Sequence, residues 1–329
     1  MNGLGANQQL PGSGSIAILG AGSLGQLWAG YLPAGSVAFV PRPTPEKEPG
    51  ASLAYRLERF DGSVRPVSVP WLSVAAAPPS LLLVTTKAGD TLSALEPHLP
   101  DLPQGAPIVL FQNGMGSQQS VAERWPRQPV LAASTTEGAN RPEPGYTVHA
   151  GKGETWVGAL TDSATPLLRQ VVNTLAASGL TVHPEADIHQ RLWDKLLVNA
   201  GINAFTAILN CRNGDILNHR FYLEHIDNLC EEIAAVMNAE DCQPLAPHAI
   251  RQRIEAVARN TANNTSSMLS DRQQGRTTEI DFINGYIARQ GQARGIRVTV
   301  NQMLTQQVQQ LSADTKAGEP SNHTRPGAS

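Results

Sequence analysis

The chain has 329 residues, of which 41% are hydrophobic and 16% charged, and its formal net charge is −3. A chain of this length and composition buries a sizeable core and forms two domains or one large one. The small negative charge excludes a broad basic surface, so we expect no nucleic-acid partner, although a local basic pocket for an acidic small molecule remains possible.

The cysteines and the apolar runs further restrict the class of protein. Cys211, Cys230 and Cys242 are odd in number and have the spacing of neither a disulfide framework nor a zinc site, so we expect packed, reduced thiols and no metal. No apolar run reaches the length of a membrane span, and residues 1–14 lack the pattern of a signal peptide. These features predict a soluble, cytoplasmic protein.

The first half of the chain has the pattern of an α/β domain. Residues 1–14 are rich in glycine and glutamine and predict a flexible leader. Over residues 15–184, short β-branched runs end in polar or glycine-containing loops and alternate with helical stretches, which predicts a parallel sheet covered on both faces. The predicted strands are 15–19, 36–40, 81–86, 107–111, 130–133, 155–157 and 180–183.

The second half is predicted to be helical. Over residues 185–314 the β runs largely disappear and helical periodicity replaces them, which predicts an all-α domain. Residues 315–329 contain glycine, proline, serine and charges without apolar periodicity and predict a disordered tail. The predicted helices are 187–208, 220–237, 247–260, 278–292 and 301–311.

A glycine turn follows the first predicted strand directly. Its residues are Gly20, Ala21, Gly22, Ser23, Leu24 and Gly25, and a helix is predicted from Leu24 to Tyr31. In a dinucleotide fingerprint the first glycine makes the tight turn, the second admits the pyrophosphate, and the third lets the helix pack on the strand. The phosphates then meet free amides at the helix N-terminus. The strand and the helix around this turn favour a dinucleotide site over an ordinary glycine-rich turn.

The end of the second predicted strand indicates which nicotinamide cofactor binds. Enzymes that use NAD usually place an acid there for the ribose 2′-hydroxyl, whereas this strand runs into Pro41-Arg42-Pro43. A guanidinium suits a 2′-phosphate, so we expect Arg42 to select NADP(H). The alternative is a solvated arginine in a proline-rich loop with Glu46 and Glu48 nearby.

Two more strands end in candidate site residues. The strand at 81–86 is followed by Lys87, and the run at 108–112 is followed by Asn113, Gly114, Met115 and Gly116. Ligands of doubly wound sheets bind outside the carboxyl ends of the strands, on the edge that carries the glycine turn. A surface lysine and an ordinary turn dipeptide are the alternative interpretations.

Three polar residues form a stripe on the helix predicted at 187–208. Lys195, Asn199 and Asn203 are four residues apart and therefore share one helix face, which apolar residues flank. Burial of these groups is costly unless they meet a ligand or one another, so the stripe is a candidate site, with a solvated face as the alternative.

Two further segments contain candidate residues. Residues 264–268 are rich in hydroxyls and amides after a helix, and simple capping is the alternative to binding. Residues 276–285 open a helix, and Glu279 in its first turn is also favoured by the helix dipole alone.

Taken together, these segments resemble the ketopantoate reductase family, over nearly the whole chain between its two ends. The resemblance is carried by the glycine turn, Thr86-Lys87, residues 112–116, Trp193-Asp194-Lys195 with Asn199 and Asn203, residues 264–268, and residues 276–285. It implies a Rossmann domain joined to a helical domain like that of 6-phosphogluconate dehydrogenase, with the site in the cleft between them. It also implies hydride transfer from NADPH to ketopantoate, giving pantoate for pantothenate and coenzyme A synthesis.

The resemblance assigns roles by position. Lys195 matches the catalytic lysine and Glu279 the glutamate beside it, while Lys87 matches a lysine on the cofactor side and Asn113 a residue near the nicotinamide and the substrate. The residues that match pantoate-binding positions are Asn199, Asn203, Asn264 and Ser267. One departure is Asp90, because many members have Lys-x-x-Gln where this chain has Lys87-Ala88-Gly89-Asp90.

The expected chemistry is acid-assisted hydride transfer. A protonated Lys195 would stabilise the charge on the keto oxygen and donate the proton, and Glu279 would orient the ammonium. The alternatives are a reductase for another 2-keto or 3-hydroxy acid and a non-catalytic NADPH-binding sensor, which needs no proton donor. A monomer and a homodimer are both compatible with the sequence.

Overall fold

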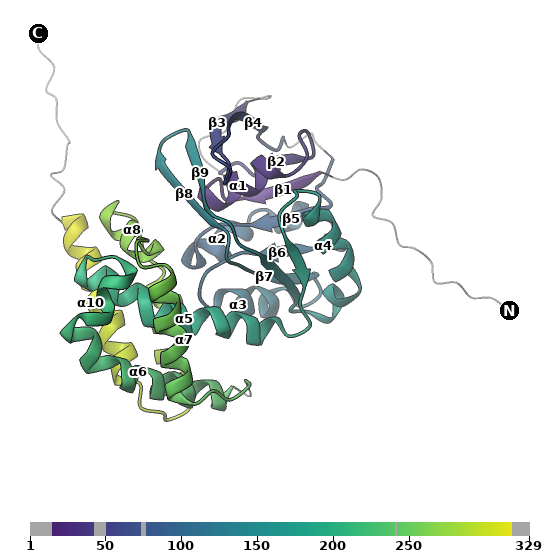
Figure 1. The fold of residues 1–329 in the computed structure, drawn as a ribbon. Helices are drawn as coiled ribbons and strands as arrows, with labels where there is room; N and C mark the ends of the chain where they lie inside the picture. The colour runs from purple at the N-terminus through teal and green to yellow at the C-terminus, as the bar shows by residue number, and fades with distance from the viewer. Residues whose placement is uncertain (1–14, 43–50, 74–76, 241, 318–329) are drawn as a thin grey trace, which may run out of the picture. The chain divides into compact units, whose positions relative to one another are not determined.

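The computed structural model describes residues 15–42, 51–73, 77–240 and 242–317 (Figure 1). The chain contains two compact units, Met1–Leu192 and Trp193–Ser329, whereas the expected domain boundary follows residue 184. The predicted leader at 1–14 lies outside the described residues, as does 318–329 of the predicted tail, while the last helix continues to Ala317.

A seven-stranded sheet forms the centre of the first unit, in the order β11-β10-β7-β6-β5-β1-β2. The strands are β1 (Ile16–Leu19), β2 (Val37–Phe39), β5 (Leu81–Val84), β6 (Ile108–Leu110), β7 (Val130–Thr135), β10 (Thr155–Ala159) and β11 (Val182–Pro184). Each corresponds to a strand predicted from the sequence.

Two strands, β10 and β11, correct the prediction of a wholly parallel sheet. The strands from β7 to β2 are parallel, and β11 is parallel to β10, but β10 pairs with β7 antiparallel. The segment that joins β7 to β10 is a β-hairpin, β8 (Gly138–Glu143) and β9 (Tyr146–Gly151), in place of a crossover helix. The chain therefore returns along the sheet in the opposite direction. The sheet is therefore mostly parallel.

Both faces of the large sheet are buried, as its continuous apolar strands predict. Ile16 and Ile18 face one apolar cluster, which includes side chains of α1 (Ser23–Tyr31) and α4 (Leu168–Ala176). Ala17 and Leu19 face the other cluster, which includes side chains of α2 (Thr91–Leu95) and α3 (Ser117–Arg124). Short 3-10 helices lie at η1 (Ala88–Asp90), η2 (Leu99–Asp101) and η3 (Asp162–Leu167).

A second, four-stranded sheet was not predicted. Its strands are β3 (Ser52–Glu58), β4 (Val64–Pro70), β8 (Gly138–Glu143) and β9 (Tyr146–Gly151), in the order β4-β3-β9-β8. The sheet packs against α1, where the Tyr55 hydroxyl donates to the Gln26 carbonyl at 2.6 Å. At Gly30 of α1 an added Cβ would lie 2.5 Å from the Leu57 side chain, so the glycine permits this close packing.

The second unit is helical throughout its described residues, which agrees with the prediction. Its helices are α5 (Ile188–Leu209, which begins in the first unit), η4 (Asn213–Asn218), α6 (Arg220–Ala239), α7 (Pro247–Asn260), α8 (Ser267–Gln273), η5 (Ile280–Phe282), α9 (Asn284–Ala293) and α10 (Thr299–Ala317). None of the described helices has the length and apolar character needed to span a lipid bilayer.

Two contacts fix helices in this unit. The buried Glu232 carboxylate on α6 accepts hydrogen bonds from the Val300 and Asn301 amides at 2.7 and 3.0 Å, which places a negative charge at the N-terminus of α10. Between α5 and α7, an added Cβ at Gly201 would lie 2.5 Å from Ile254. The two helices therefore approach closely at this position.

Candidate active site

The glycine turn has the geometry that a dinucleotide requires. Gly20 has a φ of +110°, and an added Cβ would lie 2.8 Å from the Thr86 amide nitrogen. An added Cβ at Gly25 would lie 2.1 Å from the Gly20 carbonyl oxygen, whereas one at Gly22 meets no atom within 4 Å. The first and third glycines are thus required by packing, and the second leaves the backbone open to a ligand.

Among the residues that the structure describes, no side chain caps helix α1 where it starts at this turn. Gly22 is its N-cap residue, and the first turn contains no acidic residue. The partial positive charge at such a helix end favours a phosphate. The residues around the turn therefore fit the pyrophosphate of a dinucleotide.

Arg42 lies three residues beyond the end of β2 and is exposed. Val40 still donates from its amide to the Ile18 carbonyl, so the chain leaves the sheet immediately before Pro41 and Arg42. The neighbouring Glu46 and Glu48 lie outside the described residues. No acid stands between the end of β2 and Arg42, as the sequence indicated.

The ends of β5 and β6 lie on the same edge of the sheet as the glycine turn. The Thr85 hydroxyl donates to the Gly20 carbonyl at 2.6 Å, and the buried Gln112 amide donates to the Val84 and Thr86 carbonyls at 3.0 and 3.1 Å. Lys87 and Asn113, the next residues after these contacts, are both half-buried.

Thr85 and Gln112 therefore fix the turn and the strand ends relative to one another, a role that their sequence pattern did not predict. Their only signal was their position at the ends of apolar strands. Asp90 is exposed and ends η1, where its amide donates to the Lys87 carbonyl at 3.0 Å. The departure from the family pattern at Asp90 thus lies in the short turn that follows Lys87.

In the second unit, the polar stripe on α5 is not a solvated face. Asn203 is 7% exposed, and Lys195 and Asn199 are half-buried. The buried Leu196 and Leu197 follow Lys195 directly. A lysine and two asparagines are therefore held at positions where water is partly excluded.

Burial changes the acidity of the lysine. It lowers the pKa of Lys195 to about 8, although the negative charge of Glu279 acts in the opposite direction. An ammonium with this pKa is largely protonated at neutral pH and releases its proton more readily than an ordinary lysine. Such a group is suited to act as a general acid.

Glu279 lies in a different local structure from the one predicted. It precedes the short helix η5, and α9 begins only at Asn284, because Ile283 has non-helical angles of −109° and −96°. The predicted helix at 278–292 is therefore wrong at its start, and the first-turn dipole does not account for this glutamate. Its charge acts on Lys195.

The residues beside Lys195 are anchored to other helices of the same unit. The Trp193 indole donates to Glu240 at 3.0 Å, and the Tyr286 hydroxyl donates to the same carboxylate at 3.0 Å. Asp194 forms an ion pair with Arg253 at 2.8 Å. These contacts restrict the rotation of α5 and thereby orient its polar stripe.

The segment at 264–268 contains a helix cap. The buried Ser266 hydroxyl accepts from the Leu269 amide at 3.1 Å as the N-cap of α8, and it lies 2.7 Å from the Thr206 hydroxyl on α5. The capping interpretation is therefore confirmed for Ser266. Asn264 and Ser267 are exposed, so their side chains are open to a ligand.

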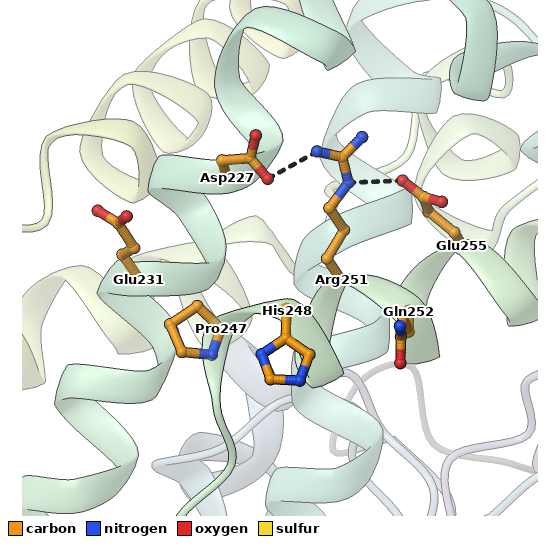
Figure 2. Close-up of a pocket in the computed structure, with 7 residues that line it drawn as sticks. All are labelled: Asp227, Glu231, Pro247, His248, Arg251, Gln252 and Glu255. Atoms are coloured by element: carbon orange, nitrogen blue, oxygen red, sulfur yellow. Dashed lines mark hydrogen bonds and ion pairs between the residues drawn. The ribbon is translucent and has the colours of Figure 1, made fainter.

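Two surface pockets in the second unit contain none of the predicted site residues. One, of about 420 Å³, lies between α6 and α7, where Arg251 bridges Asp227 and Glu255 at 2.7 Å each (Figure 2). The other, of about 590 Å³, includes Arg212 and Arg259. Within the described part of the chain, no group of three or more His, Cys, Asp or Glu residues could hold a metal ion.

Comparison with known families identifies relatives along most of the chain. The family model described as "Ketopantoate reductase PanE/ApbA" matches residues 16–162, and "Ketopantoate reductase PanE/ApbA C terminal" matches residues 187–312. A 2-dehydropantoate 2-reductase of Vibrio cholerae is 35% identical over 306 residues, which cover 90% of this chain and 97% of the relative. One of Archaeoglobus fulgidus is 32% identical, over 88% of this chain and 95% of the relative.

Solved structures agree with the fold. A PanE/ApbA family ketopantoate reductase from Ralstonia eutropha has a TM-score of 0.80 and 28% identity, with 92% of this chain and 99% of that chain covered. D-mandelate dehydrogenase with NADH and anilino(oxo)acetate has a TM-score of 0.81 at 22% identity, with the same coverage, and this similarity shows the fold alone.

Proposed function

Because the chain belongs to the ketopantoate reductase family, we propose that it reduces 2-dehydropantoate (ketopantoate) to (R)-pantoate with NADPH, in pantothenate and coenzyme A synthesis. The observation that carries this proposal is the half-buried Lys195, whose pKa is about 8 and which Glu279 influences directly. A chain that only sensed the dinucleotide would need no such proton donor.

The cofactor is a nicotinamide dinucleotide, and NADPH is the proposed form. The open backbone at Gly22 supports pyrophosphate binding, and Lys87 and Asn113 lie on the same sheet edge as the glycine turn. The exposed Arg42 after β2 supports a contact with the 2′-phosphate. When bound, NADPH supplies the hydride for the keto carbon.

Lys195 would act on the substrate oxygen. The electron pair of the carbonyl bond moves to oxygen as the carbon is reduced, and the ammonium stabilises this charge and then transfers one proton to it. The product is the hydroxy acid, and Lys195 recovers its proton from solvent. Glu279 would keep the ammonium protonated and oriented before the reaction.

The remaining proposed residues bind the substrate. Asn199 and Asn203 follow Lys195 on the same face of α5, so their amides can hold the polar groups of a small hydroxylated acid beside the proton donor. Asn264 and Ser267 have exposed side chains beside Ser266, whose hydroxyl contacts Thr206 on the same helix. Asn113 would contact both the nicotinamide and the substrate.

A spectroscopic assay tests this proposal. The protein is titrated with NADPH by calorimetry, and ketopantoate and a panel of other 2-keto acids are then added while absorbance at the nicotinamide band is followed. We expect a loss of absorbance that is fastest with ketopantoate. Faster oxidation with another keto acid would replace the proposed substrate, and NADPH binding without oxidation across the panel would favour the sensor.

A further inference from the structure

The β3–β4 hairpin places two arginines on the face of its sheet that packs against α1. Tyr55 and Leu57 of β3 are buried on this face. Arg65 is the antiparallel partner of Leu57, and partners in an antiparallel pair point to the same side. Arg59 follows Leu57 by two residues, and its amide donates to the Ser63 carbonyl at 2.8 Å, so the pairing extends to it. The two arginines are therefore diagonal neighbours, within reach of each other's long side chains.

The two guanidinium groups are partly buried, and neither forms an ion pair with a carboxylate among the described residues. The Nε atoms of Arg59 and Arg65 are both buried, and neither donates a hydrogen bond to an acceptor in the described part of the chain. Burial and the positive charge of Arg59 both lower the pKa of Arg65. Two like charges that are desolvated together are unfavourable unless an anion neutralises them.

Two carboxylates near the cluster already accept hydrogen bonds from other groups. Asp61, at the tip of the hairpin, is fully exposed and accepts from the Ser63 amide and hydroxyl at 2.9 and 2.6 Å. The Glu137 side chain is 1% exposed and lies 2.6 Å from His149 Nε2, and it also accepts from the Gly153 amide at 2.9 Å. The hydrogen bonds from Ser63 and, to a smaller extent, the charge of Arg59 lower the pKa of Asp61, so this carboxylate acts on the cluster from a distance. Neither carboxylate forms an ion pair with the two arginines within the described residues.

The position of Arg59 is fixed by an aromatic network. Its guanidinium lies over the ring of Tyr31, 5.2 Å from the centroid, and the Tyr31 hydroxyl lies 2.8 Å from His149 Nδ1. The buried His149 is held in turn by Glu137. Tyr31 thus acts as a platform that orients Arg59 before any ligand arrives.

This cluster is separate from the dinucleotide turn. Tyr31 is the last residue of α1, and the glycine turn lies at the other end of the helix, about 13 Å away at 1.5 Å per residue. Phe60, at the hairpin tip, is 55% exposed and its ring lies 5.8 Å from that of His149. An apolar surface therefore borders the two cations.

We propose that Arg59 and Arg65 form a second anion site, which binds a phosphate monoester and holds its organic part against Phe60. Two guanidinium groups match the two charges of such a dianion and can each donate to its oxygens. The site lies outside the proposed reductase machinery, so it goes beyond the reduction of a keto acid.

The test measures binding with the dinucleotide site filled. Phenyl phosphate and inorganic phosphate are titrated by calorimetry into the full chain loaded with one equivalent of NADP⁺, which fills the glycine turn without leaving an excess whose own 2′-phosphate would compete for the second site. We expect both to bind, phenyl phosphate more tightly, and Arg59→Gln and Arg65→Gln each to weaken binding at least tenfold. The matched control is Arg56→Gln, because Arg56 lies on the opposite face of β3, is 62% exposed and pairs with Glu143. It should bind both probes as the parent does.

Two results would overturn the proposal. One is the absence of binding by the parent protein at millimolar concentrations of either probe. The other is retained binding in a folded Arg59→Gln or Arg65→Gln variant, with folding checked by circular dichroism. If the parent does not bind and the variants only melt at lower temperature, the arginines instead stabilise the C-terminus of α1.

Discussion

Replacing Lys195 by methionine removes the charge and keeps an unbranched side chain of similar length on α5. Burial lowers the pKa of Lys195 from 10.5 to about 8 despite Glu279. Since one pKa unit corresponds to about 1.4 kcal/mol, the folded protein disfavours the ammonium by about 3 kcal/mol at neutral pH. We therefore expect Lys195→Met to lose almost all turnover while NADPH still binds, and to raise the free energy of unfolding at pH 7 by up to about 3 kcal/mol.

The pH dependence of this gain identifies its cause. The pKa of Lys195 is lower in the folded protein than in the unfolded chain. The charged lysine therefore lowers the free energy of unfolding by its full amount below the pKa of the folded state. This destabilisation disappears as the pH rises toward the pKa of the unfolded chain. The advantage of the variant should fall to about half near pH 9.5. Urea unfolding of both proteins at the two pH values measures it.

The matched control for this experiment is Lys152→Met, because Lys152 is exposed and its replacement should produce no such gain. A Lys195→Met variant that is no more stable than the parent at pH 7 would refute the reasoning. A gain of equal size at both pH values would also refute it, since the charge would then not be the cause.

Three further predictions concern the cofactor and the acid. Glu279→Gln should lower the pKa of Lys195 further and move the alkaline limb of kcat/KM to lower pH, and an unmoved limb would contradict the pairing. Arg42→Ala should raise the KM for NADPH far more than that for NADH, and equal effects would refute selection of the 2′-phosphate. Gly22→Ala should fold normally but weaken NADPH binding in calorimetry. Gly25→Ala should lower the melting temperature, because the Cβ at residue 25, unlike one at residue 22, would collide with the Gly20 carbonyl. Similar melting temperatures for the two variants would contradict the packing described here.

The central sheet could be predicted because its strands are apolar on both faces. A strand such as β5, with all four residues buried, needs no knowledge of its partners to be recognised. The second sheet was missed because β4 and β8 are largely exposed and contain proline and charged residues, so the period of two is weak. The reversed direction of β10 depends on the route of the intervening hairpin, which a local pattern does not contain.

The candidate site was predictable where spacing alone defines geometry. Lys195, Asn199 and Asn203 share a face on any helix, and the glycines of the turn have individual steric requirements. Whether Glu279 lies inside a helix depends on where α9 begins. The non-helical backbone angles of Ile283 set this boundary, and the helix propensities of the residues in this segment do not predict it. The roles of Thr85 and Gln112 arise from hydrogen bonds between distant segments, which become visible only when the strands are placed side by side.

The close approach of Gly201 and Ile254 links the two asparagines proposed to bind substrate to α7, a helix that contains none of the proposed site residues. Gly201 lies between Asn199 and Asn203, so one turn of α5 both presents two amides and receives α7. A methyl group at residue 201 would push the helices apart and turn the two amides away from their bound geometry together. A smaller residue at position 254 would instead leave space between α7 and the turn of α5 that contains the two asparagines. If Asn199 and Asn203 bind the substrate as proposed, the volume at two apolar positions on and against α5 therefore limits which acids they accommodate.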